Sequence, residues 1–181
     1  GMDWLRGKWG RFARFVLRCG ASVSARVPHR TIVVSRELQR FLRQMGREAD
    51  LIPNGVTATP PRPLDRLRRF GLEPGRFVLW MGRFTPEKRC EDLIAAFRHT
   101  KIDAKLLMAG ELEKGGAYAE KMRLMAEGDP RIILPGGLYG DDKAEALTSA
   151  GVAVVCSELE GLPLAALEAM QTGVCVIGSR I

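Results

Sequence analysis

Apolar residues in the second half of the chain form short continuous runs that alternate with helical patterns. The runs have strand length, and they cover residues 77–81, 104–108, 132–134, 152–156 and 174–177. Helical spacing of apolar residues covers residues 90–98, 118–126, 143–149 and 164–171. Strands that are apolar on both faces are typical of a parallel sheet with helices on both sides. The pattern therefore predicts an α/β fold with a doubly wound, Rossmann-like parallel sheet over residues 71–181.

The first part of the chain predicts a basic amphipathic helix. Its apolar positions recur at steps of three and four residues, and they are Leu5, Trp9, Phe12, Val16 and Cys19. Arginines and a lysine lie between them, while Gly7 and Gly10 weaken the helix by about 1 kcal/mol each relative to alanine.

A shorter set of elements is predicted after this helix. A strand is expected at residues 31–34, a helix at 37–45 and a brief strand that runs into a turn at 51–56. Ser35 is a plausible N-cap of the helix and Gly46 its end. Prolines prevent regular structure in residues 57–63, so we expect residues 57–70 to be a linker.

Composition narrows the class of protein. A chain of 181 residues with 46% hydrophobic and 27% charged residues is not a disordered tail, a collagen-like fibre or a disulfide-rich miniprotein. No apolar run reaches the roughly 18 residues of a membrane span, and charged residues interrupt any secretory signal. The four cysteines lack the spacing of a metal site, which favours a reduced, cytoplasmic protein.

The net charge of +7 is unevenly placed along the chain. Residues 1–70 are strongly basic, whereas residues 71–181 contain more acidic than basic side chains. Such an asymmetry indicates that one end meets an anionic partner.

Ligands of doubly wound sheets bind at the carboxyl ends of the strands. The loop after the first strand of this sheet contains Gly82, Arg83 and Lys88. Two cations on one short loop suit a diphosphate, because arginine contacts two oxygens at once and lysine supplies a point charge. The alternative to a diphosphate site is that Arg83 and Lys88 are solvated charges of the loop that pair with Glu87.

The loop after the fourth strand contains Glu160, Gly161 and Leu162, and a helix follows. Backbone N–H groups at the start of that helix are able to face an anion. Glu168 lies about two turns further on, beside an expected packed face of Leu164, Leu167 and Met170. A carboxylate there accepts hydrogen bonds from sugar hydroxyls, although the alternative is a helix charge that pairs with a neighbour.

In combination these residues resemble the retaining group 1 glycosyltransferases of GT-B architecture. The similarity lies in Gly82-Arg83-x4-Lys88 and in Glu160-Gly161-Leu-Pro-x4-Glu168-Ala-Met-x2-Gly173, with two βα units between them. Residues 33–35 and 52–56 also match the family, so the resemblance covers roughly residues 30–181.

The resemblance implies a binding site for a nucleotide-sugar donor. Arg83 and Lys88 would bind the diphosphate, Glu168 the ribose, and Glu160 with the Gly161-Leu162 backbone the donor sugar and phosphate. Gly82 belongs to the same motif, and the loop from Gly136 to Leu138 would lie against the base. Catalysis would rest on Arg83, Lys88 and Glu160. The family implies a hexosyltransferase that retains anomeric configuration and needs no metal and no cofactor; UDP, GDP and ADP donors are not distinguished.

The chain departs from the family pattern at several points. Arg89 stands where the family usually has glycine, and Cys156 where it usually has proline, while His29 and His99 match no family position. We interpret residues 1–56 as a remnant of the N-terminal acceptor domain and residues 71–181 as a donor-binding domain truncated at its C-terminus. Such a chain is expected to bind donor without transferring sugar, because the acceptor, a glycan or lipid-linked sugar, would need the missing domain.

The basic helix allows two interpretations. It could lie on an anionic membrane, which would place a peripheral protein at the inner face of the membrane, or it could pack under the missing domain. In either case we expect self-association through residues 4–45.

The sequence leaves two alternatives to a transferase. The basic region could make a non-catalytic anion- or nucleic-acid-binding module, but no aromatic RNA-binding platform or helix-turn-helix signature is present, so no specific nucleic acid is expected. A receiver-like domain needs acidic residues at the end of the first sheet strand, where this chain has Gly82 and Arg83.

Overall fold

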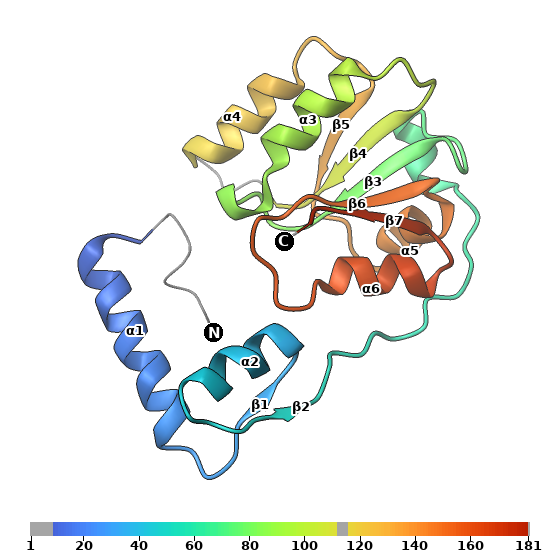
Figure 1. The fold of residues 1–181 in the computed structure, drawn as a ribbon. Helices are drawn as coiled ribbons and strands as arrows, with labels where there is room; N and C mark the ends of the chain where they lie inside the picture. Colours follow the sequence, from blue (N-terminus) through green and yellow to red (C-terminus); the bar gives the residue numbers. More distant parts are fainter. Residues whose placement is uncertain (1–8, 112–115, 181) are drawn as a thin grey trace. The chain divides into compact units, whose positions relative to one another are not determined.

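The computed structural model of the protein describes residues 9–111 and 116–180 (Figure 1). These residues form two compact units. The first unit contains residues 9–55 and Leu159–Leu162, and the second contains the remaining described residues. Each unit has its own hydrophobic core and is described by itself.

The first unit consists of α1 (Arg11–Arg26), β1 (Ile32–Val33), α2 (Arg36–Gln44) and β2 (Asp50–Leu51). The two strands are parallel, and Val33 pairs with Leu51. The Ser35 hydroxyl accepts a hydrogen bond from the Leu38 N–H at 3.3 Å, and Gly46 adopts a φ of +77° just after the helix. Both confirm the predicted start and end of α2, because an N-cap oxygen satisfies a free amide and glycine tolerates the left-handed region.

The position and packing of α1 differ from the sequence prediction. Residues 4–8 of the expected helix lie outside the described residues, and α1 continues to Arg26. Its buried residue is Ala25, which joins a core with Val33 and Leu42. Phe12, from the predicted apolar stripe, is 80% exposed. The packed part of α1 thus uses a small side chain that a stripe of large apolar residues does not reveal.

The second unit is built on a five-stranded parallel sheet. Its strands are β3 (Phe77–Met81), β4 (Lys105–Ala109), β5 (Ile132–Gly136), β6 (Val152–Val155) and β7 (Cys175–Gly178), in the order β5-β4-β3-β6-β7. In the centre, Leu79 of β3 pairs with Leu107 on one side and Ala153 on the other. The predicted doubly wound parallel sheet is confirmed, with strand ends shifted by one or two residues.

Helices cover both faces of this sheet (Figure 1). One face carries α3 (Cys90–His99) and α4 (Ala117–Ala126), and the other carries α5 (Gly140–Ser149) and α6 (Leu164–Gln171). Val78 and Trp80 pack on the α3 side, while Phe77 and Leu79 pack on the α5 side. Alternate side chains of β3 therefore enter two different cores, which explains why the strand is apolar throughout.

Part of the expected linker belongs to the core of the second unit. Residues 57–63 contain no helix or strand, as expected. The rest of the segment contains a 3-10 helix at Arg66–Phe70, and two of its leucines, Leu64 before this helix and Leu67 within it, are buried. The buried carboxylate of Glu145 accepts hydrogen bonds from the N–H groups of Asp65 and Leu67, at 3.2 and 3.1 Å. Glu145 thereby fixes the start of this short helix onto α5. The division into an acceptor-domain remnant and a donor-binding domain stays a prediction.

Candidate functional site

The strand order defines where a ligand of the second unit is expected. From β3 the chain crosses to β4 on one side of the sheet, and later it returns to β6 on the other side of β3. In doubly wound sheets such a reversal opens a crevice at the carboxyl ends of the two central strands. Gly82 and Arg83 follow β3 directly, and Cys156 follows β6. The candidate site thus lies where the first predicted motif is found.

Glycine backbones line this edge of the sheet. The Gly82 N–H donates to the Ala109 carbonyl at 3.0 Å, and the Gly110 N–H donates to the Gly136 carbonyl at 2.9 Å. A Cβ atom on Gly110 would lie 1.9 Å from the Gly82 oxygen, so only glycine fits there. Main-chain atoms without side chains allow a ligand to come close.

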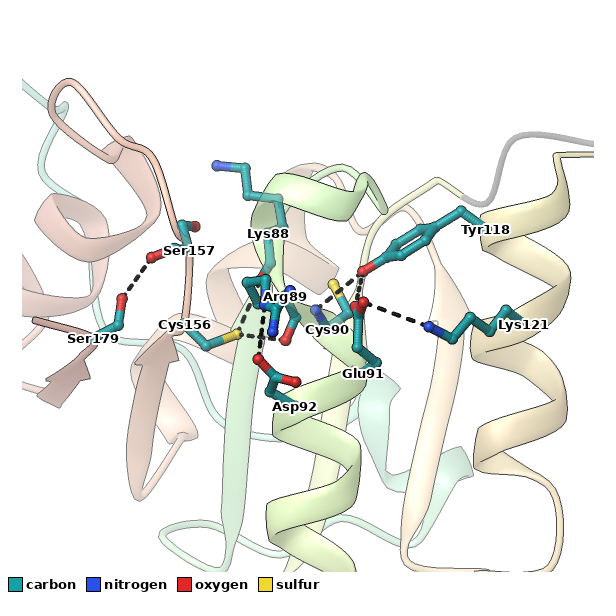
Figure 2. A network of polar contacts seen from close by, with 10 residues as sticks. All are labelled: Lys88, Arg89, Cys90, Glu91, Asp92, Tyr118, Lys121, Cys156, Ser157 and Ser179. Atoms are coloured by element: carbon teal, nitrogen blue, oxygen red, sulfur yellow. Dashed lines mark hydrogen bonds and ion pairs between the residues drawn. The ribbon is translucent and has the colours of Figure 1, made fainter. Parts of the chain in front are cut away.

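The two predicted cations lie on one loop, between β3 and α3. Arg83 is exposed, and Lys88 is the last residue of a 3-10 turn, Pro86–Lys88, that leads into α3. In Figure 2 the Lys88 side chain points away from the thiol of Cys156. Gly82, Arg83 and Lys88 thus all lie on the segment that joins β3 to α3, and their joint role in binding stays a prediction.

Side-chain contacts from α4 order the start of α3 (Figure 2). The Tyr118 hydroxyl accepts a hydrogen bond from the Cys90 N–H at 3.2 Å and donates one to Glu91, which also pairs with Lys121 at 3.5 Å. Burial raises the pKa of Glu91, but the hydrogen bonds from Tyr118 and Lys121 outweigh burial and lower that pKa below its usual value. Sequence reasoning missed this network because Tyr118 and Glu91 lie on different helices.

Cys90 lies inside this network and is fully buried. Burial raises the pKa of its thiol to about 12, so the thiol stays protonated at neutral pH. A protonated, buried thiol is a poor nucleophile. Cys90 is therefore a packing residue of the α3 side.

Glu168 is placed on α6 and forms an ion pair. Its Oε1 atom lies 2.7 Å from the Nζ atom of Lys143 on α5, and both side chains are partly buried. The expected packed face beside it is wrong in part, because Leu164 and Met170 are 49% and 63% exposed. The neighbouring Ala169 is buried instead, since α6 lies close to the sheet through its small side chain.

The predicted base-binding loop begins inside the sheet. Gly136 is the last residue of β5 rather than a loop residue, and it adopts a φ of +87°. Leu138 is buried in the core on the α5 side. A ligand would thus meet the backbone of this segment and not the Leu138 side chain.

Tyr139 is a site residue that the sequence analysis did not identify. Its hydroxyl donates to Glu111 Oε1 at 2.7 Å, and this hydrogen bond raises the pKa of the tyrosine. Its exposed ring lies against Gly137, where a Cβ atom would come within 2.7 Å of the ring. The sequence does contain a signal that points to Tyr139. It is an aromatic residue that follows the glycine pair Gly136-Gly137 at the end of a strand by two positions.

Glu160, Gly161 and Leu162 belong to the first unit. In that unit a Cβ atom on Gly161 would lie 3.7 Å from Val34 Cγ2 and 3.9 Å from Leu38 Cδ1. The other six predicted residues belong to the second unit, and they are Gly82, Arg83, Lys88, Gly136, Leu138 and Glu168.

Acidic residues of α5 pair with part of the positive charge of residues 1–70. Asp142 contacts Arg66 at 2.6 Å and Arg69 at 2.9 Å, and Asp141 contacts Arg62 at 3.2 Å. These three arginines therefore contribute less to an anion-binding surface than the charge count suggests.

Within residues 9–111 and 116–180, no group of three or more histidine, cysteine or acidic side chains is arranged to hold a metal ion. No helix in the same ranges is long and apolar enough to cross a membrane.

Most of the second unit matches the model of a protein family. The model of the family "Glycosyl transferases group 1" matches residues 67–181. Among curated proteins, N-acetyl-alpha-D-glucosaminyl L-malate synthase of Bacillus anthracis is 30% identical over 126 residues, which is 66% of this chain and 32% of that protein. Sulfoquinovosyl transferase SQD2 of Arabidopsis thaliana is 33% identical over 116 residues, or 64% of this chain and 22% of that protein. The chain thus spans a third or less of the length of these relatives.

Solved structures with the same fold include those of HepE and of a sucrose-phosphate synthase. HepE from Anabaena in complex with UDP-glucose has a TM-score of 0.81 at 19% identity, with 98% of this chain and 51% of that chain covered. Sucrose-phosphate synthase from Thermosynechococcus elongatus has a TM-score of 0.78 at 24% identity, with 98% and 47% covered. At these identities the likeness concerns the fold.

Proposed function

The chain belongs to the group 1 glycosyltransferases, and we propose that it is the nucleotide-sugar-binding portion of a retaining enzyme. The enzyme transfers a hexosyl group from an NDP-sugar to an acceptor glycan or lipid-linked sugar. The observation that supports the proposal is that Gly82, Arg83 and Lys88 follow β3, whose carboxyl end lies beside that of β6 in the parallel sheet. The UDP and UDP-glucose complexes of HepE are consistent with a donor of this class.

The roles proposed for the residues follow from the charge that develops during transfer. When the bond between the sugar C1 atom and the phosphate oxygen breaks, negative charge grows on the departing diphosphate. Arg83 and Lys88 stabilise that charge, which removes the need for a metal ion. Glu160 and the Gly161-Leu162 backbone bind the donor sugar, and Glu168 binds the ribose hydroxyls.

Base recognition is assigned to the backbone at Gly136 and Leu138. Because the Leu138 side chain is buried, peptide groups carry the contacts in this segment. Peptide groups make hydrogen bonds with any base of suitable shape, so UDP, GDP and ADP donors stay as alternatives.

Calorimetry with UDP, GDP and ADP tests this function. We expect at least one nucleotide to bind, and we expect Arg83→Ala and Lys88→Ala to weaken binding by about tenfold or more, the value of a lost charge-assisted contact. Lys101→Ala is a matched control, because Lys101 is an exposed cation in the segment that leads into the amino end of β4. Equal losses in all three variants would contradict the proposal.

The same experiment tests the alternative of a non-catalytic anion- or nucleic-acid-binding module. That alternative predicts binding to any polyanion, with a steep salt dependence and no sensitivity to Arg83 or Lys88. Family membership does not favour it.

We further propose a cytoplasmic protein that contacts the inner face of the membrane through residues 4–19. In the described part of this segment, Phe12 and Phe15 are exposed and Arg11, Arg14 and Arg18 are exposed on the same helix. Aromatic and cationic side chains together favour an anionic lipid surface. Co-sedimentation with phosphatidylserine vesicles tests this contact, with Phe12→Ser and Phe15→Ser expected to reduce it. Light scattering on the same samples separates membrane binding from self-association.

A further inference from the structure

Three consecutive carbonyl groups of the Lys88 turn face the segment after β6. Inside the turn, the Lys88 N–H donates to the Thr85 carbonyl at 2.9 Å and the Arg89 N–H donates to the Pro86 carbonyl at 3.0 Å. The next two carbonyls, those of Glu87 and Lys88, accept hydrogen bonds from residues 156–158 instead. The Arg89 carbonyl also faces this segment, but it accepts hydrogen bonds from the Asp92 and Leu93 N–H groups of α3 as well, at 3.1 and 3.4 Å.

Two donors make these contacts, and Figure 2 shows the one from Cys156. The Glu158 N–H donates to the Glu87 carbonyl at 2.8 Å. The Sγ atom of Cys156 lies 3.1 Å from the Lys88 carbonyl oxygen and 3.5 Å from the Arg89 carbonyl oxygen. The turn that carries Lys88 is therefore joined to β6 by a side-chain thiol as well as by the backbone.

The opposite side of the same segment is held by the end of β7. The Ser179 N–H donates to the Val155 carbonyl at 3.0 Å, and the Ser179 hydroxyl donates to the Ser157 carbonyl at 2.6 Å. Alternate residues of an extended segment face opposite sides, so residues 155 and 157 face β7 while 156 and 158 face the turn. The Cys156 thiol thus has a fixed position from which to act on the turn.

The thiol is suited to donate a hydrogen bond. Burial raises the pKa of Cys156, so its S–H group persists at neutral pH, and an S–H group is a weak donor. The turn also needs support from its neighbours. Arg89 has a φ of +51°, a conformation that is unfavourable for a residue with a side chain.

We infer that Cys156 is a positioning residue for Lys88. By holding the carbonyl group of Lys88, its thiol keeps the turn in one conformation and sets the direction from which the Lys88 ammonium reaches a ligand diphosphate. The role in ligand binding rests on the proposed function, whereas the hold on the turn does not. Cys156 itself contacts the peptide backbone and is not a catalytic residue.

Backbone amide exchange in the unliganded protein tests the hold directly. Cys156→Ala and Cys156→Val remove the donor, and we expect the amides of Lys88, Arg89 and Glu158 to exchange about fivefold faster in both. Cys156→Ser keeps a donor and is expected to exchange like the wild type. The control is Cys175→Ala, which changes an exposed cysteine of β7. Unchanged rates in both donor-free variants would overturn the inference, and thermal melting checks that each variant is folded.

A double-mutant cycle tests the consequence for binding. We expect Cys156→Ala to weaken the tightest of UDP, GDP and ADP by about fivefold in the wild-type background and to have no further effect in Lys88→Ala. Equal losses in both backgrounds would show that Cys156 acts elsewhere and would overturn its role in positioning Lys88. If the wild type binds none of the three nucleotides, the proposed function fails, while the exchange rates still decide whether the thiol holds the turn.

Discussion

The Nζ atom of Lys143 lies 2.7 Å from the Oε1 atom of Glu168, and this ion pair joins α5 to α6. One oxygen of the carboxylate is thereby held by a cation. A carboxylate in such a pair keeps a fixed direction, which suits it to accept hydrogen bonds from two neighbouring hydroxyl groups.

The first prediction concerns this pair and the ribose. Glu168→Ala is expected to weaken UDP binding by about tenfold, and Lys143→Ala by about threefold, because the second change only frees the carboxylate. Both effects are expected to shrink for 2′-deoxy-UDP, which lacks one of the hydroxyl groups. Calorimetry measures them, with GDP or ADP and their deoxy forms in place of UDP if one of those binds best.

Lys121→Ala is the control for the loss of an ion pair. Lys121 of α4 pairs with Glu91 of α3 and not with a predicted ligand residue. A loss in Lys121→Ala as large as in Lys143→Ala, or equal losses for UDP and its deoxy form in Glu168→Ala, would contradict the assignment of Glu168 to the ribose.

The sheet was predictable because its strands are buried on both faces. Phe77 and Leu79 enter one core while Val78 and Trp80 enter the other, so the sequence shows an unbroken apolar run. For α1, the spacing of large apolar residues predicted a helix that ends too early, because α1 continues to Arg26. The residue that packs is Ala25, and large apolar residues such as Phe12 face solvent.

The part of the candidate site that was predictable consists of residues close together in the sequence. Gly82, Arg83 and Lys88 follow one strand within a few residues, so their common position needed only the strand to be correct. The contacts of Glu145 with Asp65 and Leu67, and of Tyr118 with Glu91, join segments far apart in the chain. Local sequence patterns do not specify such pairs.

A second prediction concerns the glycine edge of the sheet. Gly110→Ala would place a Cβ atom 1.9 Å from the Gly82 carbonyl oxygen, which is backbone and has little freedom to move. We expect the free energy of unfolding to fall by about 1–3 kcal/mol and nucleotide binding to weaken, because β3 and β4 must separate at their carboxyl ends. Denaturant unfolding and calorimetry measure the two effects. Gly178→Ala is the control, since nothing lies within 4 Å of its Cβ position, and a similar loss there would contradict the argument.

A third prediction concerns Arg89, which adopts a left-handed φ of +51°. Arg89→Gly removes the conformational cost of a side chain in this region, so its melting temperature is expected to equal or exceed that of the wild type by up to about 3 °C. Arg89→Ala keeps that cost and loses the ion pair with Asp92 at 2.8 Å, so it is expected to melt below the wild type. A glycine variant less stable than the alanine variant would show that the side chain, and not the backbone conformation, decides stability at this position.

The last prediction concerns the pH dependence of the contact between α5 and the 3-10 helix at Arg66–Phe70. The hydrogen bond from Arg69, together with the charge of Arg66, lowers the pKa of Asp142 below its usual value. A carboxyl group with a lower pKa in the folded state adds stability above its unfolded pKa of about 3.9, and this stability is lost as the pH falls through the folded value.

The melting temperature of the wild type should therefore exceed that of Asp142→Asn by a few degrees at pH 7 and pH 5, and the difference should shrink below about pH 4. Added salt should also reduce the difference at pH 7, because Arg66 and Arg69 are about half exposed. A difference that is constant from pH 7 to pH 3 would mean that shape or packing, rather than the charge of Asp142, holds α5 to this helix.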